Sequence, residues 1–220
     1  MRHTTEKQAE PKKIYQRHRD RQRMAILDAA RELFIQKGIQ GTTVGDIATE
    51  ARVTRATVYQ YFANQTDVAW AILEEGFENI KEDLWNALNY DGTGYEQIAA
   101  SLSDFLVSLT QRPEHFRFLA QFDYMYASSQ EVDRLLTAIK RTLGGTLEPI
   151  ADAVRRGIMD GSLRPNLNPT LTASAIVNMA IAMAVRLEIH RKSVEIEYGY
   201  TPEQIFEEAS QLLLQGIRAT

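Results

Sequence analysis

The sequence predicts an all-α protein of about nine helices, and three observations support this prediction. Apolar residues recur at spacings of three and four along most of the chain, which is the period of a helix with one buried face. No segment alternates polar and apolar residues for long enough to form a strand. Glycines and prolines typical of turns separate the periodic segments, as at residues 91–94 and 165–169.

Three helices are expected near the N-terminus. The first covers residues 20–37 and ends at Gly38, because glycine adopts the left-handed conformation that often follows a helix. The second and third are short, at residues 44–51 and 55–61. A tight turn joins them, so they form a helix-turn-helix, whose second helix can lie in the major groove of DNA.

The caps of the two short helices can be read from the sequence. Thr43 precedes one helix as its N-cap, with Asp46 three residues later in the position of a capping box. Thr54 caps the other helix. The turn between them contains Arg52, at a position where a left-handed backbone suits glycine, so arginine is expected to cost about 1 kcal/mol there.

Six longer helices are expected in the rest of the chain. A kink or break is predicted at Gly144-Gly145 and Pro149. Residues 1–19 contain few apolar residues and are expected to form a flexible basic arm. The expected helices cover residues 65–88, 95–111, 113–127, 131–159, 170–192 and 202–218.

Charge is distributed unevenly along the chain. The net charge is −4, but residues 1–62 contain 12 Lys and Arg against 7 Asp and Glu, a net +5. Residues 63–220 contain 13 against 22, a net −9. A basic N-terminal part on an acidic body concentrates positive potential where DNA would dock and repels DNA elsewhere.

Several classes of protein are disfavoured by the sequence. There is no cysteine, so no disulfide framework and no cysteine metal site is expected. The sequence contains no glycine-rich phosphate loop and no hydrolase or metalloprotease motif, so we expect neither catalytic residues nor a cofactor nor a metal. The N-terminus lacks an apolar signal core, which favours the cytoplasm. Residues 171–189 are apolar but include Arg186 and Glu188, so no membrane span is expected.

The helix-turn-helix and its flanks resemble the TetR family of bacterial transcriptional regulators. The resemblance covers residues 20–80 and departs from the family pattern at Arg52, where glycine is usual, and at Gln65, where a phosphate-binding lysine is usual. It implies a DNA-binding domain at residues 20–80 and a ligand-binding and dimerisation domain at residues 81–220. The matching residues are Ala30, Leu33, Phe34, Gly38, Ile47, Ala48, Ala51, Val53, Thr54, Thr57, Val58, Tyr59, Tyr61 and Phe62.

Candidate DNA contacts follow from the third helix, since Val58 and Phe62 are spaced to face a core. Arg55 can pair with guanine and Gln60 with adenine, while Thr57 can meet a thymine methyl group or a phosphate. For the caps Thr43 and Thr54, capping alone also explains the residue type. The complete set of expected contacts is Thr43, Thr54, Arg55, Thr57, Tyr59, Gln60, Tyr61 and Gln65.

Four arginines stand before or within the first helix. They either reach phosphates or the minor groove of DNA, as arms of homeodomains do, or form a solvated run of charge. The four are Arg17, Arg19, Arg21 and Arg23.

The second domain contains bulky apolar residues that either line an effector pocket or form plain core. The expected ligand residues are Trp85, Phe105, Phe122, Asp123, Tyr126 and Asn178. Small and apolar residues of the last two helices favour a four-helix interface between two copies. The expected interface residues are Ala175, Ala180, Ala184, Leu212, Leu213 and Ile217.

The resemblance therefore implies a homodimer that recognises a palindromic operator and is released by a small apolar or amphipathic effector. Repression is favoured over activation. Two other functions remain open from the residues alone. One is a helical protein that sequesters a small molecule, and the other is a non-specific architectural DNA-binding protein. The acidic body argues against the architectural role, and the intact polar face of the third helix argues against sequestration.

Overall fold

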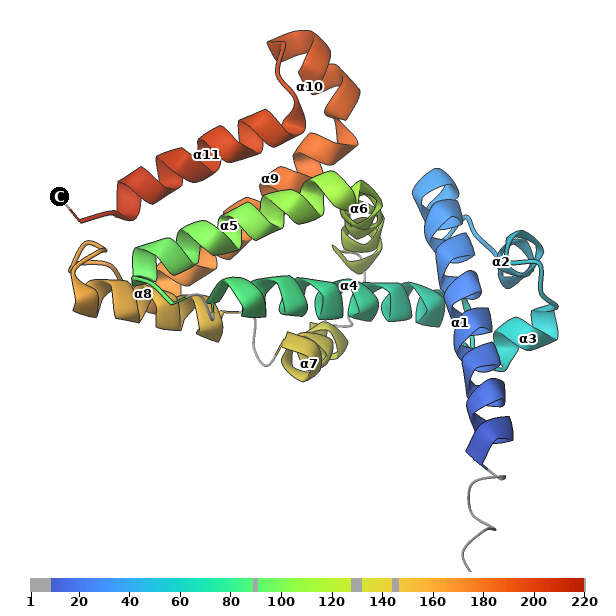
Figure 1. Cartoon of the computed structure of the whole chain (residues 1–220). Coiled ribbons are helices and arrows are strands. Elements are labelled where there is room, and N and C mark those ends of the chain that lie inside the picture. The colour runs from blue at the N-terminus through green and yellow to red at the C-terminus, as the bar shows by residue number, and fades with distance from the viewer. Residues whose placement is uncertain (1–8, 89–90, 128–131, 144–146, 220) are drawn as a thin grey trace, which may run out of the picture. The chain divides into compact units, whose positions relative to one another are not determined.

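The computed structural model describes residues 9–88, 91–127, 132–143 and 147–219, and within these ranges it contains eleven helices and no β-strand (Figure 1). The chain divides into two compact units, Met1–Ile72 and Leu73–Thr220. The expected domain boundary at residue 80 lies in the same long helix as the observed one. The prediction of an all-α fold is confirmed.

The N-terminal unit contains α1 (Ala9–Lys37), α2 (Val44–Glu50), α3 (Arg55–Tyr59) and the first turns of α4 (Gln65–Leu88). Its core is formed by the apolar stripe of α1 together with the inner faces of the short helices. The side chains of Ile26, Phe34, Ile47 and Val58 are all fully buried. The expected helix-turn-helix is present, with α3 two residues shorter than predicted.

Helix α1 is longer than the sequence suggested. The expected irregular arm is helical from Ala9 onward, and the rest of the arm, residues 1–8, lies outside the described part of the chain. The segment is rich in Lys, Arg and Gln, which favour helices, and Gln16 donates a hydrogen bond to Asp20 one turn later. Adding these turns to a helix that already exists avoids the nucleation cost of a new one.

The predicted caps of α2 and α3 are present. Asp46 accepts hydrogen bonds from the backbone N–H and the hydroxyl of Thr43, at 2.9 and 2.8 Å, and returns its own N–H to the Thr43 hydroxyl. These bonds lower the pKa of Asp46, with smaller contributions from Lys37 and Arg55. The Thr54 hydroxyl accepts the N–H of Thr57 at 3.0 Å.

The turn between α2 and α3 places Arg52 at a φ of 55°, which is the left-handed region. A side chain at this φ is strained, whereas glycine adopts it freely. We therefore expect Arg52→Gly to raise the free energy of unfolding by about 1 kcal/mol, measured by urea denaturation. Arg52→Ala, which keeps the strain, is the matched control and is expected to change stability by less. Equal effects of the two substitutions would contradict a backbone origin.

The C-terminal unit contains the rest of α4 and seven further helices, two more than expected. In place of the predicted 131–159 segment, one helix ends at Leu143 and the next begins at Glu148, with Pro149 in its first turn, while Gly144-Gly145 lie outside the described residues. The predicted 170–192 helix ends at His190, where the backbone turns into a separate α10. The seven helices are α5 (Gly94–Gln111), α6 (Pro113–Ala127), α7 (Val132–Leu143), α8 (Glu148–Asp160), α9 (Pro169–Ile189), α10 (Arg191–Tyr198) and α11 (Pro202–Ile217).

Two apolar clusters hold the C-terminal unit together. One joins α5, α8 and α9 around Ile98, Val154 and Ile176, and it includes Leu163 after α8. The other joins α5, α6, α9, α10 and α11, and the half-buried ring of Phe105 packs against its members Phe116 and Phe206. In Figure 1, α9 lies behind α5, and α11 lies above them.

Helix α9 leaves an apolar face uncovered in the single chain. Its sequence is long and apolar enough to cross a membrane by length and composition, and only 28% of it is buried in the protomer. The core helix of a soluble protein can pass the same test, so this is weak evidence for a membrane span. Leu171, Ala175, Met179 and Ala182 lie on the exposed face at helical spacing.

Candidate nucleic-acid interface

Helix α3 presents a polar face to solvent, as its sequence predicted. Val58 and Phe62 are 0% and 8% exposed and belong to the core of the unit. The opposite face exposes Arg55, Tyr59 and Gln60. Since groups that read bases must be free to reach the groove, this division of the helix satisfies the first requirement for DNA recognition.

The threonines at the start of α3 contact one another. The two hydroxyls of Thr54 and Thr57 are 2.8 Å apart, and Thr57 is half-buried while Thr54 is exposed. Thr43 is likewise exposed at the start of α2. Capping fully accounts for the hydrogen bonds that Thr43 and Thr54 make in the free protein, so their proposed DNA contacts stay predictions.

Tyr61 makes contacts that the sequence did not predict. Its hydroxyl lies 3.2 Å from the backbone oxygen of Arg19 and 3.2 Å from Oε1 of Gln22, so it donates a hydrogen bond to α1. Its ring also contacts the Arg19 guanidinium, with Cζ 5.8 Å from the ring centroid. Tyr61 thereby fixes the end of α3 against α1, and its role as a DNA contact is untested.

Arg23 stands in a similar relation to the next aromatic residue. Its Cζ lies 5.7 Å from the ring centroid of Phe62. Arg19 and Arg23 are both exposed, and their guanidinium groups lie beside the rings that follow α3. Arg19 and Arg23 precede the rings that they contact by about forty residues, so the neighbouring sequence does not indicate these contacts. The sequence alone therefore did not distinguish these two arginines from Arg17 and Arg21.

The remaining expected contact, Gln65, begins α4. It is half-buried there, and the helix is capped by Asn64, whose side chain accepts the N–H of Asp67 at 2.9 Å. A neutral amide at this position offers a phosphate one hydrogen bond without charge, which is weaker than the bond from a lysine. Whether Gln65 contacts DNA stays a prediction.

The expected ligand residues whose side chains the structure describes lie in different parts of the C-terminal unit. Phe122 is buried and its ring stacks on that of Tyr126, at 6.2 Å between centroids, whereas Phe105 belongs to the cluster around Phe206. Asp123, beside Phe122, reaches the surface, although partial burial raises the pKa of its carboxyl. Trp85 has a side chain outside the described residues.

Asn178 lies on the exposed face of α9 rather than in the interior. Its side-chain N–H donates to the backbone oxygen of Ser174 at 2.8 Å, one turn earlier in the helix. Asn178 therefore shares a surface with the expected dimer residues. A ligand role for it requires either a partner copy or a rotation of α9, and it remains a prediction.

The expected interface residues divide into two groups. Ala175 and Leu212 are exposed, while Ala180 and Leu213 are half-buried. Ala184 and Ile217 are 0% and 7% exposed and pack inside the protomer.

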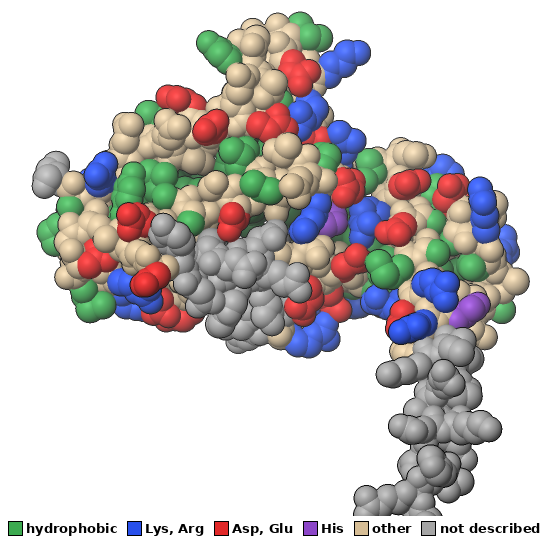
Figure 2. Space-filling view, viewed as in Figure 1, with side chains coloured by type: hydrophobic (Ala, Val, Ile, Leu, Met, Phe, Trp, Pro, Cys, Tyr) green, Lys and Arg blue, Asp and Glu red, His purple; other side chains and the backbone are tan. Residues whose placement is uncertain are grey.

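A groove lies between α9, α10 and α11, next to the exposed face of α9. Its lining residues are Met179, Ala182, Met183, Arg186, Leu187, Val194, Glu197, Tyr198, Tyr200 and Ile205. Hydrophobic side chains are exposed on α10, at the top of Figure 2.

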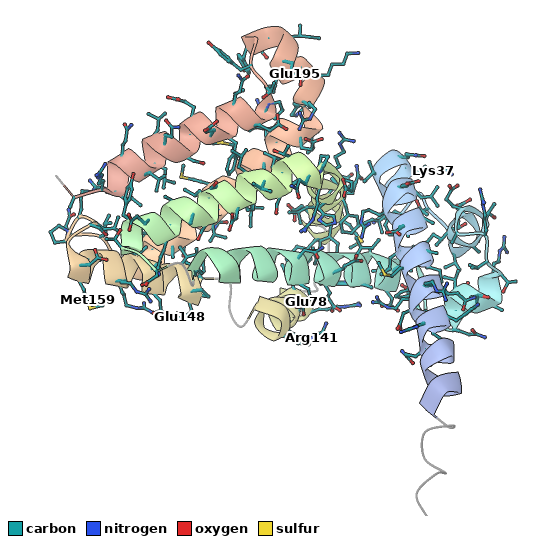
Figure 3. All side chains as sticks on the ribbon, in the orientation of Figure 1. Lys37, Glu78, Arg141, Glu148, Met159 and Glu195 are labelled. Atoms are coloured by element: carbon teal, nitrogen blue, oxygen red, sulfur yellow. The ribbon has the colours of Figure 1, made fainter. Side chains whose placement is uncertain are left out.

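The C-terminal unit contains a buried ionic network that the sequence pattern did not predict. The side chain of Glu188 on α9 is 0% exposed, and each of its oxygens contacts a different arginine. Arg117 of α6 lies 2.6 Å from Oε1, and Arg191 of α10 lies 2.7 Å from Oε2. Arg191 also contacts Glu203 at 2.6 Å and Glu195, labelled in Figure 3, at 3.9 Å.

The network has clear electrostatic effects. Hydrogen bonds to Glu203 and Glu188 raise the pKa of Arg191. Burial opposes ionisation of Glu203, but the hydrogen bonds from Arg191 prevail and lower its pKa. No group of three or more side chains able to hold a metal ion occurs among the residues that the structure describes.

Comparison with known proteins gives a consistent result. Residues 26–72 match the model of bacterial regulatory proteins of the tetR family. The uncharacterised HTH-type transcriptional regulator YfiR of Bacillus subtilis is 27% identical over 173 residues, 76% of this chain and 80% of the relative. The fatty acid metabolism regulator protein of Bacillus subtilis is 25% identical over 145 residues, 66% of this chain and 72% of the relative.

The fold is also that of a solved regulator. The transcriptional regulator FadR from Bacillus subtilis, in complex with stearoyl-CoA, superposes with a TM-score of 0.68 over 89% of this chain and 99% of that one, at 22% identity. The match extends over both units, so the likeness covers the C-terminal helices as well as the helix-turn-helix.

Proposed function

We propose that this chain is a transcriptional regulator of the TetR type, since residues 26–72 match the model of that family, and that it is a repressor released from its operator by an amphipathic effector. The observation that supports DNA reading is the division of α3 into a buried apolar face and an exposed face with Arg55 and Gln60. In this function the side chains of α3 read base edges, and Arg19 and Arg23 beside it contact phosphates.

The operator is proposed to be palindromic, because the protein is proposed to bind as a homodimer. The exposed apolar stripe of α9 supports this, since a face containing Leu171, Ala175 and Met179 is unfavourable in water. Two copies that pack α9 and α11 together would remove it from solvent. Leu212, 60% exposed on α11, then lies in the same interface. Burial in such a dimer also explains α9 without a membrane, in the cytoplasm.

The effector is proposed to be a long-chain acyl thioester. The relative with the same fold was solved with stearoyl-CoA, and the C-terminal unit here is rich in aromatic and aliphatic side chains. The space lined by Leu102, Met183, Phe206 and neighbouring residues encloses only about 10 Å³ in the free chain, room for about one water molecule. An acyl chain bound in this space would have to separate these helices, and we propose that the displacement reaches the DNA-binding unit through α4.

The test uses the operator selected by the protein from a random duplex library. Anisotropy of the labelled operator is followed at about physiological salt while acyl-CoA is added, with chains of two to eighteen carbons. We expect release to require progressively less ligand as the chain lengthens, by about fourfold for each added CH₂ until the chain fills its site. Free CoA is the matched control and is expected to leave the complex intact.

Other outcomes separate the alternative functions. Binding without any selected motif would favour an architectural protein, and tight acyl-CoA binding without operator binding would favour a sequestering protein. Loss of operator binding with free CoA alone would contradict an acyl effector. Because all named relatives above are regulators and no catalytic motif was found in the sequence, we propose no enzymatic activity.

A further inference from the structure

The backbone conformation at Gly45, the second residue of α2, does not require a glycine. It lies in ordinary helical conformation, unlike Gly38, Gly161 and Gly199, which have positive φ. Glycine within a helix is less favourable than alanine because it loses more conformational freedom on folding. The glycine must therefore be explained by neighbouring atoms that leave no room for a side chain, or by its function.

The space is occupied by the guanidinium group of Arg55. A Cβ added to Gly45 would lie 2.6 Å from Nη2, 2.9 Å from Nε and 3.0 Å from Cζ of Arg55. Distances below 3 Å between such atoms are repulsive, so any side chain at residue 45 would displace the guanidinium. Arg55 is the first residue of α3, and Thr54 fixes the start of that helix by capping it.

We propose that Gly45 is a positioning residue for DNA reading, because its missing side chain lets the Arg55 guanidinium rest against α2 in the orientation used to recognise a base. This inference rests on the proposed function. A guanidinium already held in place loses less rotamer freedom when it pairs with guanine, so affinity and discrimination at that base both increase.

The proposal makes opposite predictions for folding and for recognition. Gly45→Ala removes a helix-weakening glycine, and the atoms it displaces belong to the end of a flexible side chain, so the thermal midpoint is expected to stay the same or rise. Operator affinity is expected to fall by about tenfold. The Arg55→Ala variant identifies the base pair that Arg55 reads, because the preference at that position disappears from the motif it selects. The discrimination that Gly45→Ala loses should be concentrated at the same base pair.

The deciding experiment is a double-mutant cycle with Gly45→Ala, Arg55→Ala and the double variant, measured by operator affinity and by the ratio of operator to single-base variants. If Gly45 acts through Arg55, Gly45→Ala changes neither quantity once Arg55 is absent. An equal loss in both backgrounds would overturn the proposal, because Gly45 would then act by direct approach of its backbone to DNA. No loss in the wild-type background would overturn it as well.

The cycle separates this inference from the proposed function. It begins from an operator that the wild-type protein selects, so failure to select any motif contradicts the proposed function and this inference with it. If the wild type selects a motif but the effects in the cycle are additive, the positioning role is contradicted and the proposed function is not. Thermal midpoints of all four proteins show whether a lost affinity reflects a lost fold.

Discussion

Replacing Glu188 by glutamine is expected to lower the free energy of unfolding by about 3 kcal/mol, because the substitution removes the charge that two arginines share in the interior. Glutamine keeps the shape but turns one acceptor into a donor that faces a guanidinium. For a protein of this size the melting temperature should fall by about 6–12 °C. Urea and thermal denaturation at one fixed protein concentration measure the change.

The magnitude follows from the geometry of the network. Glu188 is fully buried, while Arg117 and Arg191 are 45% and 29% exposed. Removing the carboxylate leaves the arginines partly hydrated, which keeps the expected loss at the lower end of the range for buried ion pairs. Because Arg117, Glu188, Arg191 and Glu203 stand on α6, α9, α10 and α11 respectively, the network also joins the helices around the second apolar cluster.

A matched control is available on the surface of the same unit. Glu148, labelled in Figure 3, pairs with Arg155 at the exposed side of α8. Glu148→Gln is expected to change stability by less than about 1 kcal/mol, since water screens an exposed pair. Equal changes for Glu148→Gln and Glu188→Gln would show that the buried network does not stabilise the fold.

Local features of the fold could be predicted from the sequence. The caps at Thr43 and Thr54, the burial of Val58 and Phe62, and the separation of α7 from α8 each depend on residues within one or two turns. Such signals are contained in neighbouring positions, and the structure agrees with them.

Contacts between distant positions could not be predicted in the same way. Glu188 was taken only as a reason against a membrane span, because its partner Arg117 is 71 residues away. Arg55 was predicted to read a base, but its contact with Gly45 is visible only when α2 and α3 are packed. Ala184 and Ile217 were expected at a dimer interface but are buried inside the protomer. Small and apolar residues at helical spacing are equally typical of an interface and of a core, so the sequence could not separate the two.

Neutralising Arg19 and Arg23 is expected to lower DNA affinity by on the order of 100-fold, about tenfold for each charged contact with a phosphate. The loss should be the same for the operator and for unrelated duplexes, because phosphates carry no sequence information. The slope of log K against log salt should decrease in magnitude by about 1.8, since two fewer counterions are released. Titrations of Arg19→Gln/Arg23→Gln at several salt concentrations measure both quantities.

The other two arginines are the matched control, because the helix separates the four into pairs. At about 100° per residue, Arg17 and Arg21 lie roughly 200° around α1 from Arg19 and Arg23. Arg21 donates a hydrogen bond to the backbone oxygen of Arg17, whereas Arg19 and Arg23 lie over the rings that follow α3. Arg17→Gln/Arg21→Gln removes the same charge and should leave the salt slope nearly unchanged. An equal decrease for both pairs would mean that net charge, rather than position beside α3, determines the electrostatic contribution to binding.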